Sequence, residues 1–264
     1  MKDRIYNITI KIIFFFTAFF LTIPLILLII KGVEYIPFLI VNNEVIFSIL
    51  LSFKSTIITT LICLALAIPT SVYLNGLPLR TRKPLKNLLF LPLTLPHLVS
   101  GIALLLLFGN IGIGEFLEKY LNLSFIYTQK GIVLAQCFVN LPLTIKVILM
   151  ALDEINDKMI FVARTLGCNQ YQSFKYVVFP SLKKGIVSGA IMTWSKALGE
   201  FGAVIMVAGT TRMKTEILPT AIFLNMSTGD LDVAIGISVI LIFLSIKSLT
   251  GFENITNKNK EHKK

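Results

Sequence analysis

Long apolar runs restrict the fold of this sequence more than any other feature. A helix needs about 20 apolar residues to cross a bilayer core of roughly 30 Å, and six runs of the chain have about this length. They lack the alternation of apolar and polar residues that is typical of barrel strands. The six runs are approximately residues 8–30, 55–74, 88–108, 131–152, 185–208 and 233–249. We therefore predict an all-α membrane protein with six transmembrane helices in a single domain, residues 1–264.

Composition agrees with this class, because 55% of the residues are hydrophobic and only 15% are charged. Soluble domains have about a quarter of charged residues. The first apolar run follows Lys2, Arg4 and Lys11, as a signal peptide would. It is longer than the apolar region of a signal peptide, and no small-residue cleavage site closes it before Lys31. We expect it to be retained as a transmembrane helix.

Lysine and arginine predict the orientation, because cytoplasmic loops carry an excess of both. With the N-terminus inside, 17 of the 25 basic residues fall on the cytoplasmic side and six on the outer side. Both termini, the polar segment 153–184 and the charged tail 252–264 are then cytoplasmic, and we expect no regular structure in the tail. The net charge of +11 follows from this topology. Since no soluble basic face is present, we expect membrane lipid and not nucleic acid as a partner.

The polar segment 153–184 has the pattern of a docking element. A short helix from Lys158 is expected to stop at Gly167, and a second short helix is expected to end at Pro180. Ala163 and Gly167 are four residues apart, which would put both on one helix face where small side chains let another backbone come close. The second helix has apolar residues at helical spacing, namely Tyr171, Phe174 and Val178. We predict that this segment binds a partner protein.

The fifth run contains two charged residues and two glycines that require explanation. Lys196 and Glu200 are four residues apart, so we expect a structural ion pair on one helix face. Gly199 and Gly202 lie on either side of Glu200 and Phe201 and weaken the helix locally. A bend or gate at these glycines and close helix packing are the two alternatives.

Prolines and neutral polar residues mark possible walls of a pathway. Pro92 and Pro96 interrupt the third run, and Pro142 interrupts the fourth. Membrane proteins tolerate such interruptions where neighbours or a water-lined path satisfy the freed carbonyl groups. Three neutral side chains nearby are suited to an oxyanion or, alternatively, to helix–helix hydrogen bonds: Ser100, Asn140 and Thr144.

Motifs for chemistry on this chain are absent from the sequence. It has no Gly-x-x-x-x-Gly-Lys-Ser/Thr phosphate loop, no Gly-x-Ser-x-Gly elbow and no His-Glu-x-x-His. Cys63, Cys137 and Cys168 lack metal-ligand spacing. His97 is interpreted as a packed or solvated residue in preference to a metal ligand or proton relay. We expect no catalytic residue, no metal and no cofactor on this chain, so that energy for any transport must come from a partner.

Residues 161–180 resemble the EAA loop of permease subunits from binding-protein-dependent ABC importers. In that pattern Glu-Ala-Ala is followed by a glycine and then a proline, and here Ala163, Gly167 and Pro180 match, whereas Phe161 replaces the acidic residue. The resemblance implies a type I importer (MetI-like) bundle whose coupling helix docks on a separate ATPase subunit that binds ATP and Mg²⁺. The implied coupling residues are Ala163, Arg164, Leu166, Gly167 and Pro180.

A narrower resemblance concerns residues 196–203, Lys-Ala-Leu-Gly-Glu-Phe-Gly-Ala, which are similar to a signature of the molybdate, tungstate and sulfate branch. Residues 91–96, 140–142 and 209–219 also fit that branch. The resemblance implies a homodimeric permease in the plasma membrane of a prokaryote, served by an extracytoplasmic oxyanion-binding protein, with molybdate or tungstate as substrate. Sulfate or thiosulfate is the nearest alternative. From another class, an ion-coupled secondary carrier predicts internal repeats and midplane carboxylates, neither of which is clear in the sequence.

Overall fold

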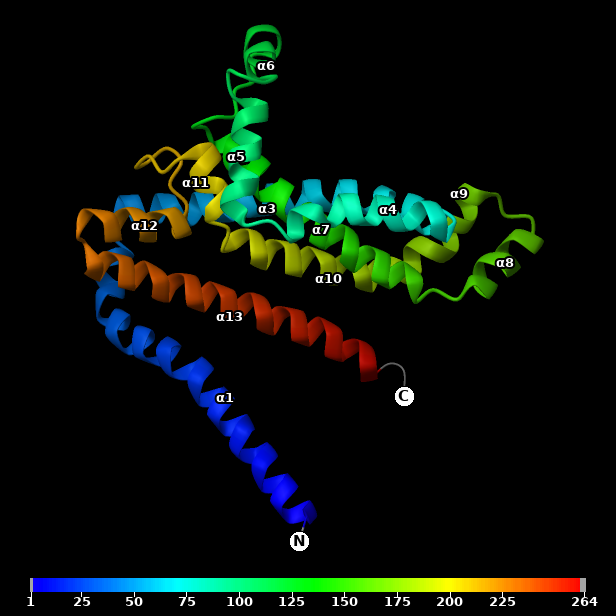
Figure 1. The fold of residues 1–264 in the computed structure, drawn as a ribbon, viewed down its shortest axis with the longest axis horizontal. Coiled ribbons are helices and arrows are strands. Elements are labelled where there is room, and N and C mark those ends of the chain that lie inside the picture. The colour runs from blue at the N-terminus through cyan, green and yellow to red at the C-terminus, as the bar shows by residue number, and fades with distance from the viewer. Residues whose placement is uncertain (1, 262–264) are drawn as a thin grey trace.

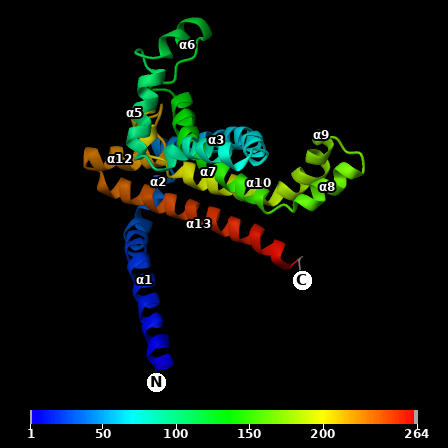
Figure 2. The same ribbon diagram turned by 45° about the vertical axis from the view of Figure 1, so that its right-hand side comes forward.

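Four long helices lie side by side and form the body of the molecule. The computed structural model describes the backbone of residues 2–261 and the side chains of residues 6–248 and 250, and within them it contains helices and no strands. The bundle consists of α3 (Asn43–Asn75), α7 (Gln129–Asp153), α10 (Phe179–Leu198) and α13 (Leu231–Glu261), which run along one direction in both views (Figures 1 and 2). The predicted all-α class is confirmed.

The N-terminal helix α1 (Lys2–Gly32) leaves this bundle at an angle (Figure 1). None of its most apolar 18-residue stretch is buried, and Phe16 and Phe20 are among its exposed aromatic residues. Its main contacts are with α13, where Gly32 lies against Val239, and with the short helix that follows it. The short helices η1 (Val33–Tyr35) and α2 (Ile36–Leu39) then lead to α3. An apolar helix of this kind must be covered by lipid or by another polypeptide.

Two of the six predicted transmembrane helices are broken. The third consists of α4 (Leu79–Phe90), η2 (Leu91–Leu93) and α5 (His97–Phe108), bent by 101°. The fifth consists of α10 and α11 (Gly202–Ala208), bent by 63°. The interruption predicted in the third run is confirmed, and the bend given as one alternative for the fifth run is present. Among the described residues, four helices are long and apolar enough to cross a membrane, or up to six if each bent pair is one crossing.

Proline has different effects at different positions of this chain. At Pro92 and Pro96 the helix does break, since proline lacks the amide donor and disfavours helical geometry in the residue before it. Pro142, in contrast, lies inside α7, which continues from Gln129 to Asp153. The interruption expected at Pro142 was wrong, since α7 continues through this residue, which is buried within the protein.

The short helices lie at the two ends of the bundle (Figure 1). At one end are α8 (Asp157–Thr165), α9 (Gln170–Ser173) and the π-helical turn η3 (Phe174–Val178). At the other end is α12 (Leu218–Thr228), while α5 and α6 (Gly114–Leu121) project sideways. The tail, expected to lack regular structure, continues α13 as helix to Glu261. The last three residues of the predicted tail lie outside the described residues.

Small residues allow α7 and α10 to pack closely. A Cβ atom added to Gly185 would lie 2.3 Å from the Cβ of Ala151 on α7, whereas at Gly189 the nearest atom would be 3.4 Å away. Glycine weakens a helix by about 1 kcal/mol relative to alanine, so Gly185 is explained by close approach and Gly189 is not. Close packing of small residues is a main source of helix association in lipid.

We predict that Gly185→Ala lowers the thermal unfolding midpoint in detergent by several degrees, because two methyl carbons cannot occupy this contact. Gly189→Ala, a matched change four residues along the same helix, should be neutral or slightly stabilising. The double variant Gly185→Ala/Ala151→Gly should recover part of the loss. Equal midpoints for the two single variants would contradict the proposed contact.

Candidate functional site

The two broken helices meet at a buried carboxylate. Glu200 follows the end of α10 and is 2% exposed. Its oxygens lie 2.9 and 3.1 Å from Nδ1 of His97, the first residue of α5. The backbone N–H of Ala203, in the first turn of α11, also donates to Glu200 at 3.2 Å. A single side chain thus connects α5, α10 and α11, and we call these residues with Gly199, Phe201 and Gly202 the junction.

The ion pair predicted between Lys196 and Glu200 was wrong. Helical spacing does not apply to them, because α10 ends at Leu198 and Glu200 lies beyond that end. Within the described residues, the side chain that contacts the Glu200 carboxylate is His97. A carboxylate only accepts hydrogen bonds, so Nδ1–H of His97 is the donor. The sequence did indicate that both residues lie at helix breaks, since His97 directly follows Pro96 and Glu200 directly follows Gly199. It did not indicate that the two breaks are in contact.

Of the alternatives for the junction glycines, the structure shows a bend, and it shows close packing at Gly202. The chain bends by 63° between α10 and α11, at the three residues from Gly199 to Phe201. Gly202 also packs closely, because an added Cβ would lie 3.0 Å from the Cβ of His97. The ring of Phe201 packs against Phe223 of α12, with 5.3 Å between centroids. The junction is therefore a bend held by close packing.

Close backbone approach also joins α5 to α11. A Cβ on Gly101 would lie 2.6 Å from the Cβ of Met206 and 3.0 Å from the Cα of Ala203. Ser100, the neighbouring residue, is fully buried, and its hydroxyl oxygen has no hydrogen-bond partner. An unsatisfied buried hydroxyl costs about 1–3 kcal/mol, so Ser100 remains a candidate for contact with a passing group.

A buried polar seam runs across α3, α7 and α10. Gln136 accepts a hydrogen bond from Thr59 at 2.9 Å and donates to the carbonyl of Ala197 at 3.0 Å. The hydroxyls of Thr144 and Thr193 are 2.7 Å apart. Of the two alternatives for Thr144, the structure therefore favours helix–helix hydrogen bonding. Asn140 donates to Gln136 of its own helix, but its side-chain oxygen is buried without a partner.

The polar segment at the far end begins with α8, which is capped by the Asn156 side chain. The helix stops because Gly167 has φ +89°, a conformation that L-residues with side chains rarely adopt, and Cys168 N–H then bonds back to the Ala163 carbonyl. Nothing lies within 4 Å of a Cβ added to Gly167. Ala163 and Gly167 therefore do not share a helix face. The glycine serves the turn, while Leu166 beside it is 80% exposed.

The second half of the segment differs from the prediction at its end. An Asn169–Gln172 capping box opens α9, and the chain continues through η3 into α10. Pro180 lies in the first turn of α10 and does not end a helix, because proline is tolerated where no amide donor is needed. Phe174 and Val178 pack against the core as predicted, whereas Tyr171 is exposed.

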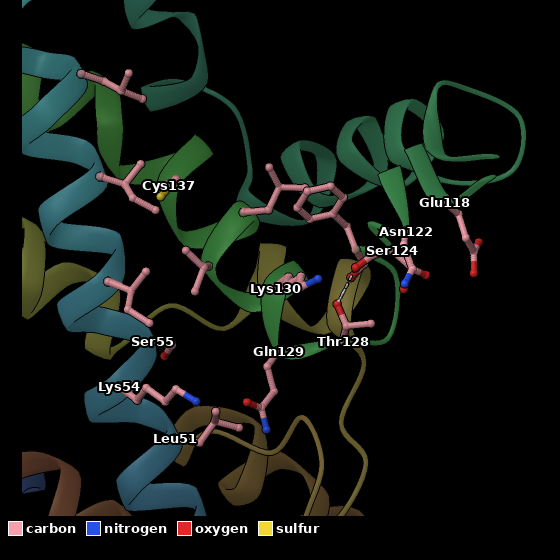
Figure 3. A pocket seen from close by; sticks show the side chains of 16 residues that line it. Leu51, Lys54, Ser55, Glu118, Asn122, Ser124, Thr128, Gln129, Lys130 and Cys137 are labelled. Atoms are coloured by element: carbon pink, nitrogen blue, oxygen red, sulfur yellow. Dashed lines mark hydrogen bonds between the residues drawn. The ribbon is translucent and has the colours of Figure 1, made fainter. Parts of the chain in front are cut away.

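A cavity of about 820 Å³ that sequence reasoning missed lies between α3, α7 and the segment after α6. Lys54 and Ser55 of α3 face it together with Gln129 and Lys130 at the start of α7 (Figure 3). Apolar residues of α3 and α7 line its remainder, among them Ile58, Ile62, Leu66 and Val133. The cavity is polar at one end and apolar along its length. This lining suits an amphipathic molecule or helix better than a small ion, which needs hydrogen-bond donors on all sides.

We predict that His97→Ala and Glu200→Gln each lower the thermal unfolding midpoint in detergent, with a cost of about 1–3 kcal/mol for the lost partner. The double variant should cost less than the sum, because the two residues are in contact. Lys196→Ala should have a much smaller effect. Additive losses at His97 and Glu200, or a loss at Lys196 as large as that at Glu200, would contradict the assigned pair.

Residues 67–252 match a family model described as binding-protein-dependent transport system inner membrane component. The molybdenum transport system permease protein ModB of Mycobacterium tuberculosis is 35% identical over 205 residues, 77% of each chain. The probable transport system permease protein NifC of Clostridium pasteurianum is 32% identical, over 75% of this chain and 69% of that one. The sulfate transport system permease protein CysT of Escherichia coli is 33% identical, over 67% and 64%.

Solved structures share the fold at low sequence identity. A bacterial alginate ABC transporter, in complex with its pentasaccharide-bound periplasmic protein, has a chain that matches with a TM-score of 0.76, 15% identity, and 96% and 94% of the two chains covered. A chain of the MetNI methionine ABC transporter in an inward-facing conformation matches with a TM-score of 0.58 and 16% identity, over 89% and 98% of the two chains. These likenesses concern the arrangement of the helices alone.

Proposed function

Because the chain belongs to the family of binding-protein-dependent transport system inner membrane components, we propose that it forms the membrane path of an ATP-driven importer of molybdate or tungstate. The observation that carries this proposal is the 35% identity to a molybdenum permease over 77% of the chain. The sulfate permease CysT, at 33% identity, supports sulfate or thiosulfate as the second candidate. A secondary carrier has no such support.

The segment around α8 is proposed as the surface that receives an ATPase subunit. It stands clear of the bundle at one end (Figure 1), and it exposes the apolar side chains of Phe161 and Leu166 beside the charged Arg164. Exposed apolar groups with a charged neighbour are typical of a protein interface. The positive φ of Gly167 keeps the turn sharp, so that Leu166 points away from the protein.

The junction is proposed as the gate. Glu200 holds the broken ends of two helices together, so a change in the angle between α5 and α11 must rearrange its hydrogen bonds. The Ser100 hydroxyl, whose oxygen has no partner, is a candidate donor to a passing oxyanion. Asn140 is a second candidate through its NH2 group, which would first have to leave the Gln136 carbonyl. Neutral donors can bind an anion without retaining it as a fixed positive charge would.

Assembly is proposed as a homodimer with ATPase subunits at the α8–α9 end and a binding protein at the α12 end. The apolar surface of α1 lies outside the bundle and needs cover by lipid or by a second copy, and the homodimer itself rests on the resemblance to the permease family. In this arrangement both termini and the α8–α9 end are cytoplasmic, in agreement with the distribution of basic residues.

Uptake measurements test the proposed substrate. We expect cells or proteoliposomes containing the complete importer and its binding protein to take up labelled molybdate or tungstate in an ATP-dependent manner, with sulfate at least tenfold less effective as a competitor. Uptake of sulfate alone would select the second candidate. Uptake that persists without ATP would contradict an ABC importer.

A charge at the proposed docking surface should uncouple the subunits. We predict that Leu166→Asp weakens co-purification of the ATPase subunit at least tenfold, because about 1.4 kcal/mol lost from an interface corresponds to that factor. Ile111→Asp is the matched control, since Ile111 is 87% exposed in the turn before α6. Both variants should insert normally. Full ATPase binding by Leu166→Asp would contradict the docking role of this surface.

A further inference from the structure

A small cavity of about 210 Å³ lies at the α12 end, where the start of α3, the loop 209–217, α12 and the start of α13 meet. Four charged groups line it: Glu44 on α3, Arg212 and Glu216 in the loop, and Asp230 between α12 and α13. From α2 and α13 the lining consists of apolar side chains such as Phe38 and Ile237. The cavity is separate from both the junction and the α8 surface.

Glu216 is the unusual member of this group. It is fully buried, and neither of its carboxylate oxygens makes a hydrogen bond of good geometry, although the main chain of Met213 lies near enough to favour its charged form. Arg212 is engaged by the other carboxylate, with its Nε 3.2 Å from Glu44 Oε1 and its NH1 group 3.3 Å from Glu44 Oε2. One guanidinium therefore faces two carboxylates, and the second of them is left without a compensating donor. A buried charge without a partner is costly.

A proton removes this conflict. Two ionised carboxylates only accept hydrogen bonds and repel each other, whereas a protonated carboxyl donates to its neighbour. We propose that Glu44 and Glu216 form a proton-binding site, and that the bound proton holds the loop 209–217 against the start of α3. When the site binds, it takes one proton from solvent, and the Glu44–Glu216 pair loses one negative charge.

The electrostatics of the loop agree with this assignment. Burial is the main cause that raises the pKa of Glu216, and the charge of Glu44 adds to it, whereas the main chain of Met213 and the charge of Arg212 act in the opposite direction. The result is a pKa of about 7 instead of the usual 4.5.

The sign of the pH dependence follows. A carboxyl whose pKa is raised by folding contributes its full stabilisation below pH 4.5, where the unfolded chain is also protonated. That contribution is lost as the pH rises toward about 7, where the folded protein releases the proton as well. The loop would then have to accommodate two adjacent charges beside one arginine.

The position of the loop gives this proton a structural consequence. The loop joins α11, and thus the junction, to α12. Its attachment to the bundle includes the Gln129 side chain, which donates to the Lys214 carbonyl at 3.2 Å, and Ser52 Oγ of α3, which accepts from Leu218 N–H at 2.8 Å just after the loop. Loss of the proton weakens a third attachment, at Glu44, and so loosens the α12 end of the protein. This inference does not depend on which ion is transported.

Infrared titration of the purified full-length protein in detergent tests the site directly. We expect the carbonyl stretch of a protonated carboxylic acid at pH 6, and its loss with a midpoint near pH 7. Glu216→Gln, whose amide imitates the protonated carboxyl, should lack this band and should show a flatter dependence of the unfolding midpoint on pH between 5 and 8. Glu115→Gln, an exposed glutamate in the first turn of α6, should behave as the parent.

A second variant keeps the test decisive if Glu216→Gln is poorly produced. Glu44→Gln removes the neighbouring charge, so the band should persist and titrate at lower pH. The assignment is overturned if the parent shows no such band at pH 6, or if the band survives unchanged in Glu216→Gln. A parent without the band but with a thermal stability that rises with sodium or potassium concentration would also overturn it, in favour of a bound alkali cation.

Discussion

The arrangement of the bundle centre depends on the hydrogen bonds of Glu200. Two helices end inside the protein near this residue, and each broken end leaves backbone groups that lipid cannot satisfy. The carboxylate accepts from the first turn of α11 and from the side chain that begins α5, so it satisfies the start of one helix and fixes the start of another. His97 in turn makes the buried charge tolerable. Together with the close packing of Gly202 on His97 and of Gly101 on Ala203, this contact supports the bends at residues 94–96 and 199–201.

Around the junction, hydroxyls, amides and small residues bring the helices together. Lipid removes the usual hydrophobic advantage of helix association, so packing and interhelical hydrogen bonds must supply it. In this chain Gly185 and Gly101 permit close approach, and Gln136 joins three helices by its contacts with Thr59 and Ala197. The same seam contains Asn140, whose buried side-chain oxygen has no hydrogen-bond partner. An unpaired polar atom at the centre of a bundle is expected where function competes with stability.

The apolar runs predicted most of the fold, because length and hydropathy alone determine which segments can cross a bilayer. Proline predicted the break between Leu93 and His97, but the same reasoning failed at Pro142, which is accommodated within α7. The pairing of Glu200 was missed for a related reason. Helical spacing selected Lys196 as its partner, and this reasoning fails once the helix ends at Leu198. The contact with His97 joins residues 103 positions apart, and local spacing contains no information on it.

The helix that contains Pro180 connects the α8–α9 end of the protein to the junction. Because the proline lies in the first turn of α10, the chain is helical without a break from η3 to Leu198. Twenty residues of helix span about 30 Å, so α10 connects the segment beside α8 directly to the residue before the junction. A packed helix transmits displacement because its neighbours allow discrete arrangements and little continuous deformation. A partner that moves α8 and η3 would thus act on Glu200 through one rigid element, and the bend at Gly199 is where that movement would be converted into a change of angle.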